Sequence, residues 1–358
     1  MKKDQILILA HNTRSAGTLN YTKNLIDTID EHSNYLITIP NQLKTDSEYV
    51  IKYKNSDRLF FKLLYSIWNN LKTYLIIKKV RPKKVIVLGN YFVNPFKNIE
   101  TKILVRHPYL LAPNSVNILN KKRKLEELVR KEYFKLTLRT NNHIVIQNKR
   151  FENIIRDYYN FKGTITVLYN AIYGIDNYSE QSISERENIF IYPSRYYEHK
   201  NHIFLIKFVS KFLTDLKKHK IKIILTIEEE TLDLRKFDIR LLKEVIIFLG
   251  EIKQKDLFDV YSQCKGIIFP SNEETFGNGL VEGLLHSLPI AIINRPYATT
   301  LLGNYGFYFD DNSFDELRRI LMKIISFNEE DIFELNKKRN HLLQTFDNFQ
   351  NWLDKISY

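Results

Sequence analysis

The chain has one cysteine and no long apolar run, and both absences limit where it can work. Cys264 is the single cysteine among 358 residues, so no internal disulfide can form. No stretch of about 18 apolar residues occurs, which excludes a membrane-spanning helix. The apolar part of the opening MKKDQILILAHN is too short for a signal peptide. We therefore expect a cytoplasmic protein, and one that would lie on the inner face of the cytoplasmic membrane if it meets a membrane at all.

Several nucleic-acid and metal motifs are also missing. Lys and Arg give a net charge of +13, which favours a polyanionic partner or an anionic surface. Because the sequence has no zinc-finger spacing, RNP-type aromatic motif or Gly-rich RNA clamp, we expect no nucleic-acid partner. No D-x-D motif precedes an apolar strand, and Asp310 and Asp311 fall in a late, surface-like turn. We therefore predict no metal site and no cofactor.

What the sequence does contain is two sets of short, β-branched apolar runs that alternate with longer amphipathic stretches. This alternation predicts parallel strands joined by crossover helices, an α/β doubly wound architecture. The first set closes near Asn170, and the polar stretch 173–188 is predicted to be an interdomain linker. The predicted strands are 6–10, 35–39, 84–89, 102–106, 143–147 and 164–170 in the first set, then 189–193, 222–227, 245–250, 266–270 and 289–293.

The segment 266–293 is the most informative. An apolar strand leads into a polar loop, then Phe276, Gly277 and Asn278, then a helical pattern. This order places backbone N–H groups at a bound anion. Glu274 in the loop can accept hydrogen bonds from sugar hydroxyls, and Glu282 in the helix can hold the two hydroxyls of a ribose. An acidic helix start that only complements the helix dipole is the alternative.

Three further positions are weaker candidates. Arg195 and Lys200 follow the strand at 189–193, where ligands bind in open α/β sheets, and they suit a diphosphate, although two loop cations are usually just solvated. Gly17, in the predicted loop after the first strand, permits close approach of a ligand or serves packing alone, with His11 and Arg14 beside it. His107, after the strand at 102–106, can donate to a sugar hydroxyl or simply pack before a turn.

These pieces occur together in one order, in which the sequence resembles the family-4 retaining glycosyltransferases of the GT-B fold. The resemblance is clearest over residues 188–312. Glu274 to Glu282 looks like the family's E-x7-E element, preceded by its Pro-Ser, and SRYYEHKNH looks like the segment with the phosphate-binding Arg and Lys. The segment 245–271 is similar to the strand, turn and helix that line the base pocket, and VLYNAI resembles the turn between the domains.

The resemblance implies a fold, a site and a domain division. Two Rossmann-like domains would face a cleft, with an acceptor domain at 1–172 and a donor domain at 173–344. The last helix, about 345–358, would pack back on the first domain. Residues expected to take part in catalysis are Glu274, Arg195, Lys200 and His107. Residues expected to bind the donor are Gly17, Arg195, Lys200, Glu274, Phe276, Gly277, Asn278 and Glu282.

The sequence also departs from the family. Gly283 stands where Ala is usual, and Ser287 stands where a helix-ending Gly is usual, so the exit of that helix is open. The strand at 222–227 leads into three glutamates instead of a Gly-rich turn, and the segment 294–304 lacks the usual downstream Glu. These differences concern selectivity for the donor sugar.

We therefore expect a metal-independent, hexosyltransferase-like retaining enzyme. It would move a sugar from a nucleotide-diphosphate sugar, with a UDP-sugar favoured over a GDP-sugar, to a glycan or lipid-linked glycan. The synthesis of bacterial surface polysaccharide, lipopolysaccharide O-antigen or capsule, is the expected setting. One alternative is a nucleotide-sugar 2-epimerase of the same fold. Another is a non-catalytic protein that binds an anionic membrane surface through the basic, amphipathic stretches 56–84 and 121–139.

Overall fold

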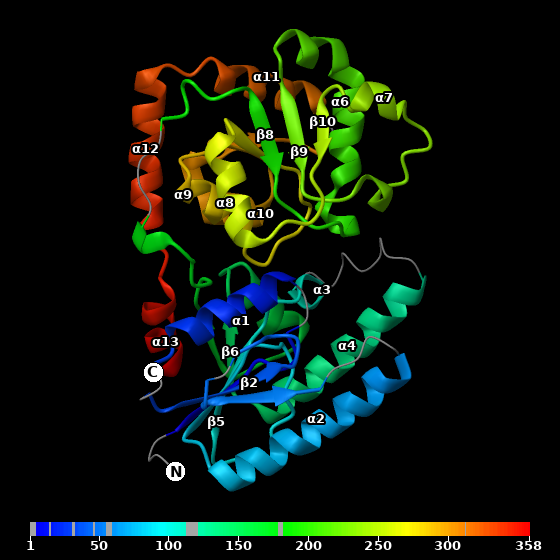
Figure 1. Cartoon of the computed structure of the whole chain (residues 1–358). Helices are drawn as coiled ribbons and strands as arrows, with labels where there is room; N and C mark the ends of the chain where they lie inside the picture. Colours follow the sequence, from blue (N-terminus) through cyan, green and yellow to red (C-terminus); the bar gives the residue numbers. More distant parts are fainter. Residues whose placement is uncertain are drawn as a thin grey trace. The chain divides into compact units, whose positions relative to one another are not determined.

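The computed structural model divides the chain into two compact units. Unit 1 comprises Met1–Tyr173 and Phe349–Tyr358, and unit 2 comprises Gly174–Asn348. The structure describes residues 5–13, 16–30, 33–45, 47–54, 59–111, 121–177, 182–311 and 313–358. Each unit is built around its own parallel sheet with helices on both faces (Figure 1).

Unit 1 contains a seven-stranded sheet in the order β3-β2-β1-β4-β5-β6-β7, and each pairing in it is parallel. Starting from β1, the chain adds strands outward in one direction and then returns to add them in the other. This is the doubly wound arrangement. The strands are β1 (Ile6–Leu9), β2 (Tyr35–Pro40), β3 (Val50–Tyr53), β4 (Lys84–Val87), β5 (Glu100–Leu104), β6 (His143–Ile146) and β7 (Thr164–Val167).

Helices cover both faces of this sheet because its central strands are apolar on both sides. The helical segments are α1 (Ala16–Thr28), α2 (Leu59–Val80), α3 (Pro108–Leu111), α4 (Lys121–Thr140), α5 (Phe151–Asn153), the π-helix η2 (Ile154–Tyr158) and α13 (Phe349–Ser357). Side chains of β1 alternate between two cores, so that Ile8 joins α1 and α13 on one face, whereas Leu7 and Leu9 join α2 and α4 on the other.

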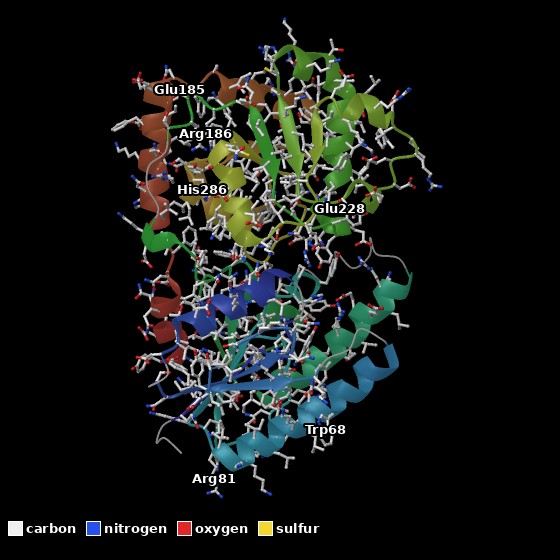
Figure 2. The ribbon with its side chains drawn as sticks, viewed as in Figure 1. Trp68, Arg81, Glu185, Arg186, Glu228 and His286 are labelled. Carbon is white, nitrogen blue, oxygen red and sulfur yellow. The ribbon has the colours of Figure 1, made fainter. Side chains whose placement is uncertain are left out.

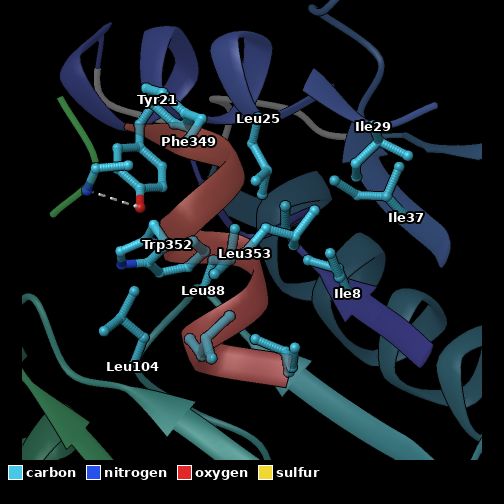
Figure 3. Close-up of a cluster of buried hydrophobic side chains, with 14 of the residues drawn as sticks. Ile8, Tyr21, Leu25, Ile29, Ile37, Leu88, Leu104, Phe349, Trp352 and Leu353 are labelled. Carbon is cyan, nitrogen blue, oxygen red and sulfur yellow. Dashed lines mark hydrogen bonds between the residues drawn. The ribbon is translucent and has the colours of Figure 1, made fainter. Parts of the chain in front are cut away.

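The last helix of the chain belongs to unit 1. Trp352 of α13 is fully buried and meets the ring of Tyr21 edge-on, with 5.5 Å between ring centroids (Figure 3). Lys84 of β4 donates from Nζ to the carbonyl oxygen of Ser357 at 2.6 Å. Residues some 270 positions apart in the sequence are therefore held in one core.

Unit 2 contains a six-stranded parallel sheet in the order β10-β9-β8-β11-β12-β13. Its strands are β8 (Ile189–Tyr192), β9 (Lys222–Leu225), β10 (Ile246–Phe248), β11 (Gly266–Phe269), β12 (Ile290–Ile293) and β13 (Phe307–Phe309). Its helical segments are η3 (Ile175–Asn177), η4 (Glu198–Lys200), α6 (His202–Lys218), η5 (Glu229–Thr231), α7 (Ile239–Leu242), α8 (Gln254–Gln263), α9 (Asn278–Leu285), α10 (Pro296–Leu302), η6 (Gly303–Tyr305), α11 (Phe314–Ile325) and α12 (Glu329–Leu343).

The α/β fold class predicted from the alternating runs is confirmed, with two additions. Strands β3 and β13 were not predicted, because each is an edge strand of three or four residues with mixed burial. The predicted linker is partly packed: Ile183 is fully buried, and Arg186 donates from Nη1 to the carbonyl oxygen of Cys264 at 2.8 Å. Among the described helices, none is both long and apolar enough to cross a membrane.

Candidate functional site

The candidate residues of unit 2 gather where the strand order of its sheet reverses. Strands β8 and β11 are parallel neighbours, and the chain runs outward from β8 on one side and from β11 on the other. Open α/β sheets bind ligands at this switch point, beyond the carboxyl ends of the two strands. Arg195 and Lys200 follow β8, and Glu274 follows β11. The topology thus brings three predicted residues to one edge of the sheet.

Lys200 and Glu274 form an ion pair there, from the Nζ of Lys200 to the Oε1 of Glu274. The two side chains are only 16% and 10% exposed, so the pair lies largely out of water. Lys200 ends the single turn η4, and its carbonyl oxygen accepts a hydrogen bond at 2.7 Å from the hydroxyl of the fully buried Tyr192. The backbone at Lys200 is therefore held by the core of the unit.

Backbone hydrogen bonds join the two loops that carry this pair. The carbonyl oxygen of His199 accepts from the amide of Asn272 at 2.8 Å. Ser271 is fully buried, and its carbonyl oxygen accepts from the Tyr297 hydroxyl at 2.7 Å. Because each loop holds the other, Lys200 and Glu274 keep their relative positions without depending on a ligand.

Helix α9 begins directly beyond Glu274, as the sequence predicted. Gly277 caps it with φ of 90° and ψ of 59°, a left-handed conformation that favours glycine, and an added Cβ would lie 2.9 Å from Leu280 Cδ1. Phe276 before it is buried, and its ring meets that of Phe346 edge-on at 5.9 Å. Asn278 is the first residue of the helix. The N–H groups of the first turn of α9 therefore start beside the ion pair, where a helix dipole favours an anion.

Close packing holds this helix end near the loop after β8. A Cβ at Gly279 would lie 3.0 Å from Cγ and 3.4 Å from the carbonyl oxygen of Pro193. One turn further on, a Cβ at Gly283 would lie 2.2 Å from Cδ1 of Ile267 in β11. The departure from Ala at Gly283 thus has a packing reason, because the Ile267 side chain takes the space of the missing methyl group.

Glu282 lies one turn inside α9 and is held by two side chains from α8. Gln254 donates from Nε2 to one carboxylate oxygen at 2.9 Å, and the hydroxyl of the fully buried Tyr261 donates to the other at 3.1 Å. Burial raises the pKa of the Glu282 carboxyl above its ordinary value, and the two hydrogen bonds counteract part of that rise. Gln254 and Tyr261 were not singled out from the sequence, although both lie in the segment assigned to the base pocket.

Arg195 is placed differently from Lys200. Its guanidinium is 41% exposed and is paired with the carboxylate of Glu251, which follows β10. A pair this exposed contributes little to stability, so the guanidinium can exchange Glu251 for another anion at small cost. Glu251 was not identified from the sequence, because it comes from a third strand end.

The glutamates after β9 include one that lies against a glycine. Gly250 has φ of 74°, and an added Cβ there would lie 2.4 Å from Oε1 of Glu228 (Figure 2). The site of the expected Gly-rich turn therefore has a carboxylate packed on the backbone of the next strand end. This is a concrete difference from the family pattern on the same edge of the sheet.

Helix α9 ends with Ser287 in the conformation that a glycine usually adopts at this position. It adopts φ of 60°, and the amide of Leu288 donates back to the carbonyl oxygen of Gly283 at 3.0 Å, which is the helix ending that usually requires glycine. The hydroxyl of Ser287 accepts a hydrogen bond from Nη1 of the fully buried Arg339 in α12. The serine therefore replaces the usual glycine without changing the turn.

The two candidates from the first half of the chain lie in unit 1. His107 follows β5, and its Nε2 lies 3.0 Å from Nη1 of Arg130 and 3.7 Å from Oε2 of Glu127, both on α4. The prediction that Gly17 lies in a loop is wrong: it is the second residue of α1, because the helix starts at Ala16. Its backbone φ is not positive, so no glycine-specific conformation is needed there.

The sequence also pointed to two residues beside Gly17, His11 and Arg14. His11 is buried and stacks on Tyr53 at 4.2 Å between ring centroids, with its Nδ1 2.8 Å from the Thr38 hydroxyl. His11 therefore acts as a packing residue of unit 1. Arg14 lies outside the described residues. Over the ranges that the structure describes, no group of three or more His, Cys, Asp or Glu side chains is placed to hold a metal ion.

Known proteins resemble the second unit of this chain in sequence and nearly the whole chain in fold. The sequence model of the family described as glycosyl transferases group 1 matches residues 175–341. A curated relative, the O-antigen chain mannosyltransferase RfbU of Salmonella typhimurium strain LT2, is 21% identical over 279 residues, which cover 76% of this chain and 71% of the relative.

Solved structures with the same fold cover nearly all of the chain. WaaG, a glycosyltransferase involved in lipopolysaccharide biosynthesis, matches with a TM-score of 0.71 at 14% identity, over 98% of each chain. HepE of Anabaena in complex with UDP-glucose matches with a TM-score of 0.68 at 15% identity, over 99% of each chain. Sucrose-phosphate synthase of Thermosynechococcus elongatus matches with a TM-score of 0.73 at 12% identity, over 98% of this chain and 97% of that one. At these identities the likeness is one of fold.

Proposed function

We propose, from the premise that this chain is a group 1 glycosyltransferase, that it transfers a hexose from a nucleotide-diphosphate sugar to a saccharide or lipid-linked acceptor. The observation that carries the proposal is the Lys200–Glu274 pair at the β8–β11 switch point, beside the first turn of α9. A cation, a carboxylate and the N-terminus of a helix at one point match the parts of such a donor. They would meet its diphosphate and its sugar hydroxyls.

The donor is proposed to bind with its ribose at Glu282 and its diphosphate at Lys200 and Arg195. An ionised carboxylate held by Gln254 and Tyr261 keeps lone pairs that can accept from two adjacent hydroxyls. Glu274 would accept from hydroxyls of the sugar, and the amides from Phe276 to Asn278 would hold it. A UDP-sugar is favoured, and HepE, which shares the fold, is known in complex with UDP-glucose.

Catalysis is proposed to be metal-independent and to retain the configuration at the anomeric carbon. Lys200 and Arg195 would stabilise the negative charge that grows on the departing diphosphate, the role a divalent ion has in other transferases. The acceptor would attack on the face that the diphosphate leaves, with a donor phosphate oxygen taking its proton. Such a reaction needs no pair of acid and base carboxylates, and His107 would contact the sugar.

The acceptor is proposed to be a growing glycan of a bacterial surface polysaccharide, O-antigen or capsule. The curated relative is named an O-antigen chain mannosyltransferase, and WaaG is described as acting in lipopolysaccharide biosynthesis. We place the enzyme in the cytoplasm, peripherally on the inner face of the membrane, because a lipid-linked acceptor is presented there.

The direct test is a panel of UDP-, GDP- and ADP-sugars, with donor hydrolysis measured alone and transfer measured with lipid-linked glycan acceptors. We expect one nucleotide class to be hydrolysed slowly without acceptor and consumed faster with it, the product keeping the anomeric configuration of the donor. Conversion of the donor sugar to its 2-epimer without any acceptor would instead identify an epimerase. If no donor binds or reacts, the assignment of the site is wrong.

The site can be tested within the same assay. Glu274→Ala should depress turnover strongly, because it removes a contact to the reacting sugar. Glu282→Ala should mainly raise the donor KM, because the ribose is remote from the chemistry. Equal transfer rates for both variants and the parent enzyme would refute this placement of the donor.

A further inference from the structure

Helices α2 and α4 of unit 1 carry large apolar side chains that point into solvent. Figure 2 shows Trp68 on α2. Trp68 is 62% exposed, and Val129 on α4 is 64% exposed. A folded protein rarely leaves so many large apolar side chains together in water unless the surface binds something. The exposed apolar residues of the two helices are Trp68, Leu71, Leu75, Leu125, Leu128, Val129 and Leu136.

Their spacing puts them on one side of each helix. Positions 68, 71 and 75 differ by three and four, and positions 128, 129 and 136 lie three, four and eleven residues after position 125. Residues at these intervals stack on a single face. The opposite sides carry the core contacts, Ile77 from α2 and Phe134 from α4. Each helix therefore has two apolar sides, of which only one is used by the core.

The two exposed sides belong to neighbouring helices. The Asn70 side chain of α2 lies close enough to the Tyr133 hydroxyl of α4 to counter part of the rise in the pKa of Tyr133, and the helices run alongside each other (Figure 1). We call the surface made by these seven apolar residues and the cations around them the α2–α4 face.

The α2–α4 face is strongly basic. Helix α2 contains four lysines and no carboxylate, and α4 contains eight Lys or Arg against three Glu. Two of those glutamates are paired: Glu127 accepts from Arg130 at 2.5 Å, and Glu132 accepts from Lys135 at 2.7 Å. The exposed Lys78 and Lys79 lie in the last turn of α2, so cations border the exposed apolar residues of this helix.

A basic pocket adjoins the end of this face. It has a volume of about 510 Å³ and lies between the C-terminal part of α4 and the segment after η2. Lys135, Arg139 and Lys162 line it with Tyr158 and Tyr159. Arg139 lies one turn from Leu136. A group that enters the pocket could therefore belong to the same molecule that covers the exposed apolar residues.

We propose that the α2–α4 face docks on a bilayer that contains anionic phospholipid. Its apolar stripe would enter the boundary between headgroups and acyl chains, its cations would meet lipid phosphates, and the pocket would take one phosphorylated headgroup. A second copy of the chain would bring a face of the same positive charge, which opposes pairing, whereas an anionic bilayer complements it. This proposal rests on the proposed peripheral location and adds the surface that would make the contact. None of the residues of this surface belongs to the donor site.

Sedimentation of the full chain with vesicles of phosphatidylglycerol and phosphatidylcholine tests the proposal. Binding should be strong with the mixed vesicles at low salt, weak with phosphatidylcholine alone, and reduced at high salt. Equal binding to both compositions, or none at low salt, would overturn it. Sedimentation velocity without lipid should give a monomer; a dimer that the face variants dissociate would mean that a second copy covers the face, and the lipid proposal would fall.

The tryptophans report the geometry of binding. The sequence has two, of which Trp68 is on the face and Trp352 is fully buried in the core of unit 1. Mixed vesicles should shift the emission to shorter wavelength, and brominated acyl chains should quench it. Trp68→Phe should abolish both effects. Persistence of the shift in that variant would place the contact elsewhere.

Matched variants separate lipid docking from catalysis. Leu71→Glu with Leu75→Glu, and separately Lys78→Glu with Lys79→Glu, should each lower vesicle affinity on the order of tenfold. The controls lie on α12 of unit 2: Phe333→Glu, which is 67% exposed, and Lys337→Glu with Lys338→Glu. All variants should keep the melting temperature and the rate of donor hydrolysis. If the α12 variants lose binding as much as the face variants, the face is not the docking surface.

Discussion

The ammonium group of Lys200 is ion-paired with the carboxylate of Glu274 across 74 positions of sequence. Both residues were predicted to contact the donor, one at its diphosphate and the other at its sugar. Their pairing means that each holds the other in position before a donor arrives. Because the pair is mostly buried, either partner alone would be a costly unpaired charge.

Removing one partner should therefore destabilise unit 2 more than removing both. Lys200→Met should lower the free energy of unfolding by about 3 kcal/mol, and adding Glu274→Gln should recover part of that loss. Denaturant titration measures both. The exposed Arg195–Glu251 pair provides the control, since Glu251→Gln should cost under about 1 kcal/mol. Additive effects of the two buried substitutions would show that the pair is not coupled.

Glu282→Gln should stabilise the protein at neutral pH while weakening donor binding. Burial raises the pKa of Glu282, so the folded chain holds a proton there more tightly than the unfolded chain does. The ionised carboxylate therefore costs stability above that pKa, and the cost disappears as pH falls below the ordinary carboxyl value. The rise in melting temperature should be clear at pH 8 and absent near pH 4. Donor affinity should fall about tenfold or more.

Acid should destabilise unit 2 through His202. This buried imidazole is placed with Nε2 3.1 Å from the carbonyl oxygen of Ser194, and burial lowers its pKa to about 4. The neutral ring contributes stability that is present above about pH 6.5 and lost as pH falls toward 4, up to about 3 kcal/mol. His202→Gln should flatten this slope in thermal melts between pH 7 and 4. His341→Gln, at an exposed position of α12, should leave it unchanged.

Substitutions at Ser287 should rank in an unusual order. Alanine keeps the left-handed strain and loses the hydrogen bond from buried Arg339, whereas glycine loses the same bond but relieves the strain. Ser287→Ala should therefore be less stable than Ser287→Gly by about 1 kcal/mol. Chemical denaturation of the two variants gives the comparison. Equal stabilities would mean that the turn relaxes without strain.

Transfer should survive removal of divalent ions. Arg195 and Lys200 are proposed to provide the charge that a metal would otherwise bring to the diphosphate. Full activity after treatment with EDTA is expected, at unchanged donor KM. An activity that EDTA abolishes and Mg²⁺ or Mn²⁺ restores would refute the proposed mechanism.

Local patterns in the sequence were sufficient for much of the fold. The period of the apolar runs predicts strands and helices because burial imposes it residue by residue. The same holds for the start of α9, since glycine is favoured where a left-handed residue precedes a helix, as Gly277 does. Edge strands β3 and β13 were not predicted, because three or four residues of mixed burial show no alternation of apolar and polar side chains. The start of α1 was set too late because its first turn contains Gly17, a weak helix former.

The sequence by itself determined that the chain is α/β, that it forms two units, and that Glu274, Glu282, Arg195 and Lys200 follow strands or begin a helix. Tertiary structure alone decided how these groups pair. Strand order puts β8 beside β11 and so joins Lys200 to Glu274, and the packing of α8 on α9 gives Glu282 its two hydrogen bonds. Pairings of this kind arise between distant segments, whose distance and burial no local spacing of residues encodes.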